Sequence, residues 1–194
     1  MIILSINKNS MKRVFDIFFV ITTLPISLPL FLVGCLLSRF NLNEPIIYSQ
    51  IRVGQDGSFF LIYKIRTISN NLEKNQTNSS AEISTLGSFL RLSKIDELPQ
   101  LFNVLKGNMS IIGPRPEQPH YVEEYLKLNP SFNLRHVIKP GITGWSQVNM
   151  PKATPKDNLK KLEYDLYYIK QYSWKLDFII LIKTVKIILT FNGN

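Results

Sequence analysis

The stretch I-F-F-V-I-T-T-L-P-I-S-L-P-L-F-L-V-G-C-L-L-S at residues 17–38 decides how the chain is organised, because it carries no charge and is interrupted by Pro25 and Pro29. A helix of this length would reach roughly 33 Å, enough to cross a hydrocarbon layer of about 30 Å. A soluble core helix is therefore disfavoured. A cleaved signal peptide is also disfavoured, since the run continues into Arg39 without an A-x-A-like cleavage site.

Pro29 lacks an N–H and would clash with the carbonyl of Pro25, so we expect the helix to kink or break there. The resulting fragments, about 12 and about 10 residues long, are each too short to cross a bilayer. Positive charge flanks both ends of the run: Lys8, Lys12 and Arg13 precede it, and Arg39, Arg52, Lys64 and Arg66 follow it. Because neither end should be exported, this pattern favours a re-entrant hairpin over a kinked spanning helix, which stays as the alternative. We expect residues 1–40 to form the anchor and residues 41–194 one compact domain.

Composition narrows the class of partner. The chain has 194 residues, a formal net charge of +9 and a single cysteine, Cys35. The surface should attract anions, which include nucleic acid, anionic lipid and phosphorylated small molecules. An internal disulfide is excluded, and His120 and His136 lack zinc-site spacing. There is no G-x-x-x-x-G-K-S/T or G-x-G-x-x-G loop. Nucleic-acid binding is disfavoured because basic and aromatic residues are not interleaved on one face.

The remaining patterns predict a mainly helical α+β domain. Two apolar stretches around V-G-Q-D-G, residues 46–50 and 58–65, predict a β-hairpin, and polar residues 69–84 predict an exposed loop. Helices are expected at residues 85–92, 97–105 with a start near Asp96, 121–128 and 158–171, with K-P-G-I-T-G-W at 139–145 as a turn. Residues 174–191 fit either a helix at the bilayer interface or a core helix, equally well.

The segment R-L-S-K-I-D-E-L-P-Q-L-F-N-V-L-K-G-N-M-S-I-I-G-P-R-P at residues 91–116 contains the adjacent acids Asp96 and Glu97. At a helix start, one carboxylate can aim at a phosphorus atom while the other holds a metal or a proton, and the helix N-terminus favours phosphate. A carboxylate can also act as a covalent nucleophile. The alternative is structural, since Ser93 to Asp96 fits a capping box, and spacing alone favours it.

Pro114 and Pro116 restrict the backbone around Arg115, which makes this arginine a candidate diphosphate clamp. Further cations could neutralise a diphosphate: Lys64, Arg66, Arg91, Arg135 and Lys139. Each of these, taken alone, fits a solvated surface charge better.

Several motifs in one order carry a family resemblance. They are K-R-V-F-D at 12–16, Q-I-R-V-G at 50–54, I-Y-K-I-R-T at 62–67, the S-K-I-D-E-L-P block through G-P-R-P, K-P-G-I-T-G-W-S-Q-V-N at 139–149 and Y-D-L-Y-Y-I-K at 164–170. From residue 11 to 190 the chain resembles bacterial sugar transferases, the monotopic phosphoglycosyl transferase family. The resemblance supports the re-entrant anchor, and it implies a monotopic protein at the cytoplasmic face of the bacterial inner membrane.

The resemblance implies transfer of a phosphosugar from a UDP-sugar to undecaprenyl phosphate, with release of UMP, as the initiating step of exopolysaccharide, capsule, O-antigen or glycoprotein glycan synthesis. It implies that Asp96 is the nucleophile, that Glu97 binds metal or activates the acceptor, and that Mg²⁺ is required. Its expected substrate-binding residues are Lys64, Arg91, Arg115 and Asp165, to which the charge pattern adds Arg66 and Arg135. The partners expected are the UDP-sugar, undecaprenyl phosphate and the lipid bilayer, without nucleic acid; a homodimer is compatible with the chain.

The chain departs from the family pattern in three places. Leu28 precedes Pro29 where a serine is common, Asn108 replaces the acid of K-G-D-M-S, and Met150 and Pro151 replace a glycine and a basic residue after Q-V-N. The lack of the additional segments of larger relatives predicts a minimal catalytic form. The rival functions are a catalytically inactive membrane anchor or scaffold, in which Asp96 only caps a helix, and a basic nucleic-acid binder.

Overall fold

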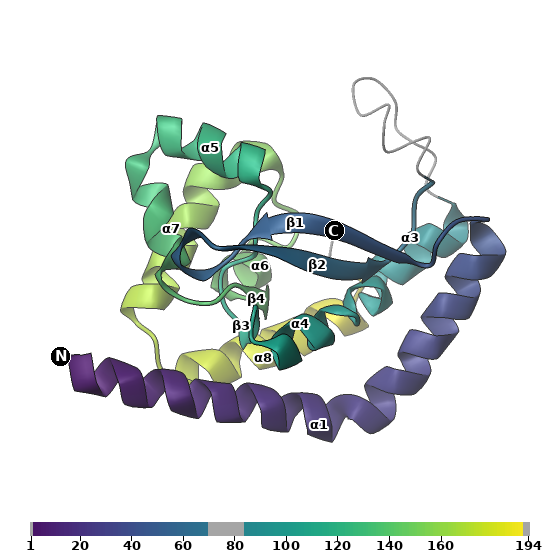
Figure 1. Ribbon diagram of the computed structural model, residues 1–194, viewed down its shortest axis with the longest axis horizontal. Coiled ribbons are helices and arrows are strands. Elements are labelled where there is room, and N and C mark those ends of the chain that lie inside the picture. The colour runs from purple at the N-terminus through teal and green to yellow at the C-terminus, as the bar shows by residue number, and fades with distance from the viewer. Residues whose placement is uncertain (1, 70–83, 192–194) are drawn as a thin grey trace.

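The computed structural model describes residues 2–69 and 84–191, and it is mostly helical, with two small two-stranded sheets among these residues. A long helix, α1 (Ile2–Asn41), curves around one side of the other elements (Figure 1). The helices are α1, α3 (Thr85–Leu92), α4 (Gln100–Lys106), α5 (Pro119–Leu128), α6 (Trp145–Asn149), α7 (Asn158–Lys170) and α8 (Trp174–Leu189). Short 3-10 turns are η1 (Gln55–Gly57), η2 (Ile95–Glu97), η3 (Pro130–Val137) and η4 (Pro155–Asp157). The expected mainly helical α+β class is confirmed.

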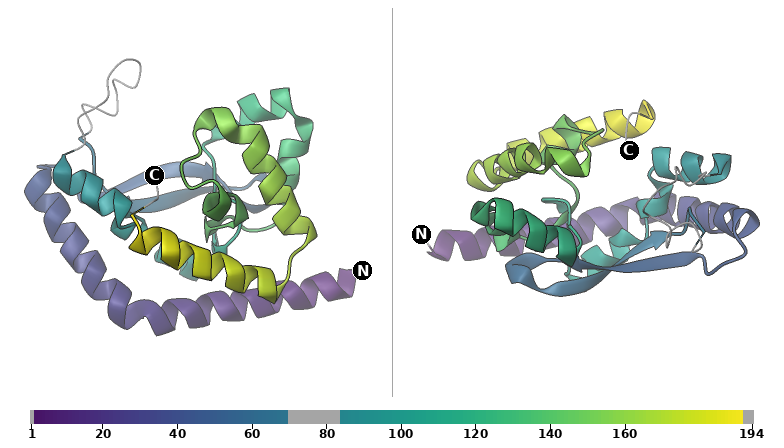
Figure 2. Two further views of the ribbon diagram at one scale, coloured as in Figure 1. Left: turned by 180° about the vertical axis from the view of Figure 1, so that it is seen from behind. Right: turned by 90° about the horizontal axis from the view of Figure 1, so that it is seen from above.

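Helix α1 is bent but continuous, with Pro25 and Pro29 inside it (Figures 1 and 2). Each proline removes one backbone hydrogen bond and crowds the preceding turn, which accounts for a bend. The prediction of a kink is confirmed, whereas two separate short fragments are not present. We call residues 10–24, before Pro25, the first arm and residues 30–41, after Pro29, the second arm. Ser10–Asn41 is long and apolar enough to cross a membrane, with only 11% of its most apolar window buried.

The first arm is fastened to the rest of the protein by polar contacts. Lys12 forms an ion pair of 2.6 Å with the buried Asp177 of α8. Asp16, 1% exposed, accepts hydrogen bonds from the Ser110 hydroxyl (2.9 Å) and the Ile111 N–H (3.0 Å). Arg13 donates to the carbonyls of Val104 and Leu105, which lie in the last turn of α4. Three residues of the K-R-V-F-D motif, Lys12, Arg13 and Asp16, therefore hold the first arm against the rest of the protein.

The second arm returns to the same body. The buried Ser38 hydroxyl donates to the Arg66 carbonyl at 2.7 Å, directly after strand β2. Both arms of α1 therefore contact one compact unit, while the opposite side of the helix is apolar and exposed. Its exposed side chains include Phe18, Ile21, Ile26, Leu32 and Leu36.

The predicted β-hairpin is confirmed: β1 (Ile47–Val53) pairs antiparallel with β2 (Phe59–Ile65), with Ile47 opposite Ile65 and Val53 opposite Phe59. A second, parallel pair joins β3 (Ser110–Ile112) to β4 (Gly141–Thr143), where a simple turn was expected. At Gly141 a Cβ atom would lie 2.0 Å from the Gly113 nitrogen, so the close approach of these segments requires glycine. This pair lies in the main core, with Val104, Met109 and Ile180.

The helices at α3, α5 and α7 are confirmed. Helix α4 begins at Gln100, not near Asp96, because a separate 3-10 turn carries the acid pair. The predicted loop at 69–84 falls almost entirely outside the described residues. Helix α8 buries Leu176, Asp177 and Ile180 and exposes an apolar face made of Phe178, Ile182, Val185 and Leu189. One side of α8 is thus core, and placement of its other side at a bilayer interface stays a prediction.

Candidate active site

The acid pair lies in turn η2, which is held by an unusual residue before it. Lys94 has a φ of 59° and adopts the left-handed conformation, so the chain reverses between α3 and η2 and brings Asp96 and Glu97 inward. Both are buried, at 6% and 8% exposure. The Ser93 hydroxyl donates back to the Phe89 carbonyl at 2.8 Å, and no side chain caps η2 or α4. The capping-box interpretation is therefore wrong.

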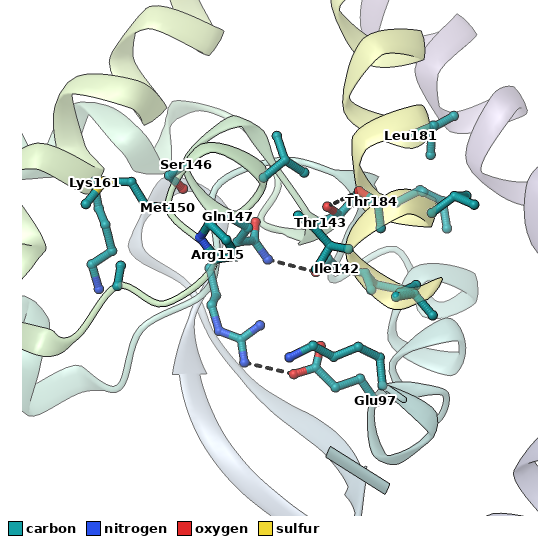
Figure 3. Close-up of a pocket in the computed structure, with 18 of the residues that line it drawn as sticks. Glu97, Arg115, Ile142, Thr143, Ser146, Gln147, Met150, Lys161, Leu181 and Thr184 are labelled. Atoms are coloured by element: carbon teal, nitrogen blue, oxygen red, sulfur yellow. Dashed lines mark hydrogen bonds and ion pairs between the residues drawn. The ribbon is translucent and has the colours of Figure 1, made fainter. Parts of the chain in front are cut away.

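Glu97 is surrounded by cations. Its Oε1 accepts from Lys64 Nζ of β2 at 2.9 Å. The same oxygen accepts from Arg115 Nη2 at 2.9 Å (Figure 3). Burial opposes ionisation of Glu97, but the charges of Arg115 and Lys64 outweigh it and hold its pKa well below the usual range. Glu97 is consequently a fixed negative charge that orients two cations.

Asp96 has the opposite environment. Its Oδ1 is buried and has no hydrogen-bond partner within residues 2–69 and 84–191. Burial and the neighbouring charge of Glu97 raise its pKa to about 6, against the opposing charges of Lys64, Lys94 and Arg91. A buried carboxylate oxygen without a donor is poorly stabilised, which makes it available as a nucleophile or a metal ligand.

Arg115 is positioned from behind by a buried ion pair. Arg135 Nη2 donates to the backbone carbonyl of Arg115 at 2.8 Å and lies 2.7 Å from Asp165 Oδ2. The Arg135 and Asp165 side chains are 4% and 1% exposed, whereas that of Arg115 is 41% exposed. The arrangement fixes the backbone at Arg115 and leaves its guanidinium accessible to an anion.

The other predicted substrate-binding arginines occupy different places. Arg91 donates to the Thr67 hydroxyl at 2.9 Å, and its charge lowers the pKa of Asp96. Arg66 is buried, donates to the Pro45 carbonyl at 2.9 Å and lies 3.5 Å from Glu44, so it fastens the end of β2 to the segment before β1.

Two residues near the acid pair were not predicted from the sequence as site residues. Lys94 was not selected although it lies two positions before Asp96, a proximity that could have indicated it. Arg52 of β1 lies 4.0 Å from Glu117, and its charge acts on both Arg115 and Glu97. Arg52 lies there because the end of β1 meets the segment after Arg115: Arg52 donates to the Pro116 carbonyl at 3.1 Å, and the Val53 N–H donates to the Glu117 carbonyl at 3.0 Å. No local signal in the sequence predicts this contact.

A cavity of about 580 Å³ adjoins the acid turn. Its charged part includes Lys94, Glu97 and Arg115, and Figure 3 shows Arg115 reaching across it to Glu97. Its apolar part lies between the first arm of α1 and α8 and is lined by Phe19, Leu181, Val185, Ile187 and Ile188. Asp96, next to the lining residue Glu97, is not itself among the lining residues. The cavity therefore suits an amphiphile with an anionic group.

Comparison with known proteins gives a consistent result. The family model described as bacterial sugar transferase matches residues 7–191. The chain is 40% identical over 187 residues to a UDP-N-acetylgalactosamine-undecaprenyl-phosphate N-acetylgalactosaminephosphotransferase of Aeromonas hydrophila, covering 94% of this chain and 44% of that protein. It is 38% identical over 181 residues to a UDP-glucose:undecaprenyl-phosphate glucose-1-phosphate transferase of Klebsiella pneumoniae, covering 90% and 39%. An uncharacterized sugar transferase of Bacillus subtilis is 36% identical over 185 residues, covering 94% and 89%. The chain thus spans less than half of the first two relatives.

Proposed function

This chain belongs to the bacterial sugar transferase family, and we propose that it transfers a phosphosugar from a UDP-sugar to undecaprenyl phosphate with release of UMP. The names of the relatives supply the substrate classes. The observation that carries the proposal is the buried Asp96 Oδ1, which lacks a hydrogen-bond donor in the described chain and adjoins the Lys64–Glu97–Arg115 cluster. In a surface polysaccharide pathway this reaction is the initiating step.

In the first half-reaction, Asp96 Oδ1 attacks the phosphorus that bears the sugar. A bond forms between this oxygen and phosphorus, the bond from phosphorus to the bridging oxygen breaks, and UMP leaves with that oxygen. In the second, an oxygen of undecaprenyl phosphate attacks the same phosphorus and restores the Asp96 carboxylate. Lys64 and Arg115 stabilise the negative charge that develops on the phosphoryl oxygens.

Mg²⁺ fits the donor set. Mg²⁺ is commonly held by one or two protein carboxylates together with substrate phosphates, and Asp96 would offer the carboxylate oxygen that does not attack phosphorus. Glu97 Oε1 already accepts from two cations, so Glu97 would contribute its other oxygen. When bound, the ion would neutralise diphosphate charge and assist departure of UMP.

The anchor supports action at one membrane face. Lys12 and Asp16 of the first arm and Ser38 of the second arm contact the same compact unit. Because a compact domain lies on one side of a bilayer, these contacts support our proposal that both arms return to that side, with α1 re-entrant and the protein monotopic. We place the protein at the cytoplasmic face of the inner membrane because the proposed donor is a nucleotide sugar. The cavity between α1 and α8 then opens a route for the prenyl chain to reach Arg115.

The test is UMP release from a panel of UDP-sugars by protein purified in detergent, with undecaprenyl phosphate and Mg²⁺. We expect one donor to give turnover, and incubation with that donor alone to leave a phosphosugar adduct that mass spectrometry assigns to Asp96. Asp96→Asn should form no adduct. Its matched control is Asp56→Asn, which makes the same substitution at the exposed tip of the β-hairpin and should form the adduct normally. An adduct on another residue contradicts the nucleophile assignment, and the absence of turnover with every donor favours the scaffold.

Topology is tested separately in intact cells, in a Cys35→Ala background. A membrane-impermeant thiol reagent should label neither a cysteine placed at Ser10 nor one placed at Asn43. External labelling at one position only would show that α1 spans the membrane.

A further inference from the structure

Gly34 lies in the second arm of α1, where this apolar helix meets the turn that carries Asp96. A Cβ atom at this position would lie 2.6 Å from Cγ2 of Ile95 and 2.7 Å from Cδ1 of Ile65. Both separations are below 3.0 Å, and Cβ atoms in proteins essentially never come so close to another heavy atom. Glycine is therefore required for α1 to approach so closely.

The two residues that Gly34 meets flank the charged groups of the candidate active site. Ile95 directly precedes Asp96 in turn η2, and Ile65, 1% exposed, directly follows Lys64 in β2. Lys64 in turn lies 2.9 Å from Glu97. One position of the membrane helix thus touches both chain segments that hold the acid pair and its cation.

The two contacts would yield differently to a side chain at position 34. Cδ1 of Ile65 is the end of its side chain and can move by rotation about χ2. Cγ2 of Ile95 is bonded directly to Cβ, and branching at Cβ restricts χ1, so this methyl moves mainly with the backbone. Pressure at Gly34 is consequently transmitted to the backbone of Ile95 and the adjoining Asp96.

We propose that Gly34 is a positioning residue: through its contact with Ile95, the second arm of α1 sets where turn η2 holds Asp96 and Glu97. The position of the second arm of α1 against the domain then determines the positions of Asp96 and Glu97. The inference rests on the proposed function only in that turnover is one of its readouts. A displacement of about 1 Å at reacting groups can lower a rate by about 10²-fold.

The principal variant is Gly34→Ala, which adds one methyl and favours helix more than glycine does, so α1 itself is not weakened. We expect kcat to fall by about 10- to 100-fold, with the KM for the UDP-sugar changed less than about twofold. Leu36→Ala, at a side chain of the same arm that is 59% exposed, is the control and should keep its kcat. An unchanged kcat in Gly34→Ala overturns the proposal.

Second-site variants separate positioning from general damage. Ile95→Leu carries no methyl on Cβ and should restore most of the kcat of Gly34→Ala, whereas Ile95→Val keeps that branch and should not. Ile65→Val removes the other close atom and should restore little. Rescue by Ile65→Val alone, or equal rescue by both substitutions at Ile95, would show that the contact with the acid turn is not the route.

A measurement without turnover keeps the outcome independent of the reaction. In ¹⁵N-labelled protein in micelles, the amide signals of Asp96 and Glu97 should shift in Gly34→Ala. In the double variant with Ile95→Leu they should match those of the Ile95→Leu single variant. Should Gly34→Ala fail to fold, Ile95→Ala in the original background takes its place, and a normal kcat there contradicts the proposal. An unmutated protein that releases no UMP would refute the proposed function alone, since the amide signals still decide this inference.

Discussion

The two sides of turn η2 differ sharply although they are one residue apart. Glu97 accepts from Lys64 and Arg115 at 2.9 Å and has a pKa far below its usual range. Asp96 has a buried oxygen without a donor in the described residues and a pKa raised to about 6. The two cations thus stabilise Glu97 and leave Asp96, the proposed nucleophile, poorly stabilised. This difference supports a positioning role for Glu97 and a chemical role for Asp96.

The largest expected effect breaks the chemical side. Asp96→Asn keeps the shape of the side chain but replaces the carboxylate of the proposed nucleophile with a neutral amide, so turnover should fall by at least about 10³-fold. Glu97→Gln keeps the nucleophile and disorders the cations, and should lower turnover by about 10²-fold. UMP release under saturating donor measures both. If Glu97→Gln is the more damaging and Asp96→Asn retains turnover, the two roles are reversed.

The same substitutions should change stability in opposite directions. A carboxylate whose pKa is raised by about 2 units destabilises the fold at neutral pH, so Asp96→Asn should stabilise the protein by about 1–3 kcal/mol. Glu97→Gln leaves Lys64 and Arg115 without their counter-charge and should destabilise it, by roughly 1–3 kcal/mol because both cations are partly exposed. Thermal unfolding in detergent with EDTA measures both. Shifts of the same sign would contradict the comparison.

The pH dependence of stability provides a further test of the difference between Asp96 and Glu97. The folded pKa of Asp96, about 6, lies above its ordinary value of 3.8, so its contribution is most favourable below pH 4 and is lost as pH rises through 6. The folded pKa of Glu97 is depressed, so its contribution is present above its ordinary value of 4.5 and is lost as pH falls below it. The stability gained by Asp96→Asn should therefore grow between pH 4 and 7 without metal, while the loss in Glu97→Gln should shrink below pH 4.5. Differences that are constant with pH would exclude these titrations.

Local patterns in the sequence predicted much of the fold but few of the contacts between the residues of the candidate site. The hairpin of β1 and β2 and helices α3, α5 and α7 follow from alternation, glycines and helix signals within each segment. Strands β3 and β4 have three residues each and pair across a long separation, so no local period reveals them. Spacing favoured a cap for Asp96, whereas the family motif indicated a nucleophile. The partners of Glu97 lie 33 and 18 residues away, and only the folded chain brings them together.

The smallest expected effect concerns the clamp on the Glu97 side. Arg115→Lys keeps the charge, and the Arg135 hydrogen bond is to the backbone carbonyl of residue 115, so the turn itself should persist. Lysine loses the fork that can grip a phosphate and Glu97 together. We expect the KM for the UDP-sugar to rise about tenfold with kcat changed less than about threefold. Asp96 should be little affected, because its raised pKa depends first on burial and on Glu97. A fall in kcat comparable with that of Asp96→Asn would show that the reaction step needs the guanidinium fork itself, and that the positive charge retained by lysine does not suffice.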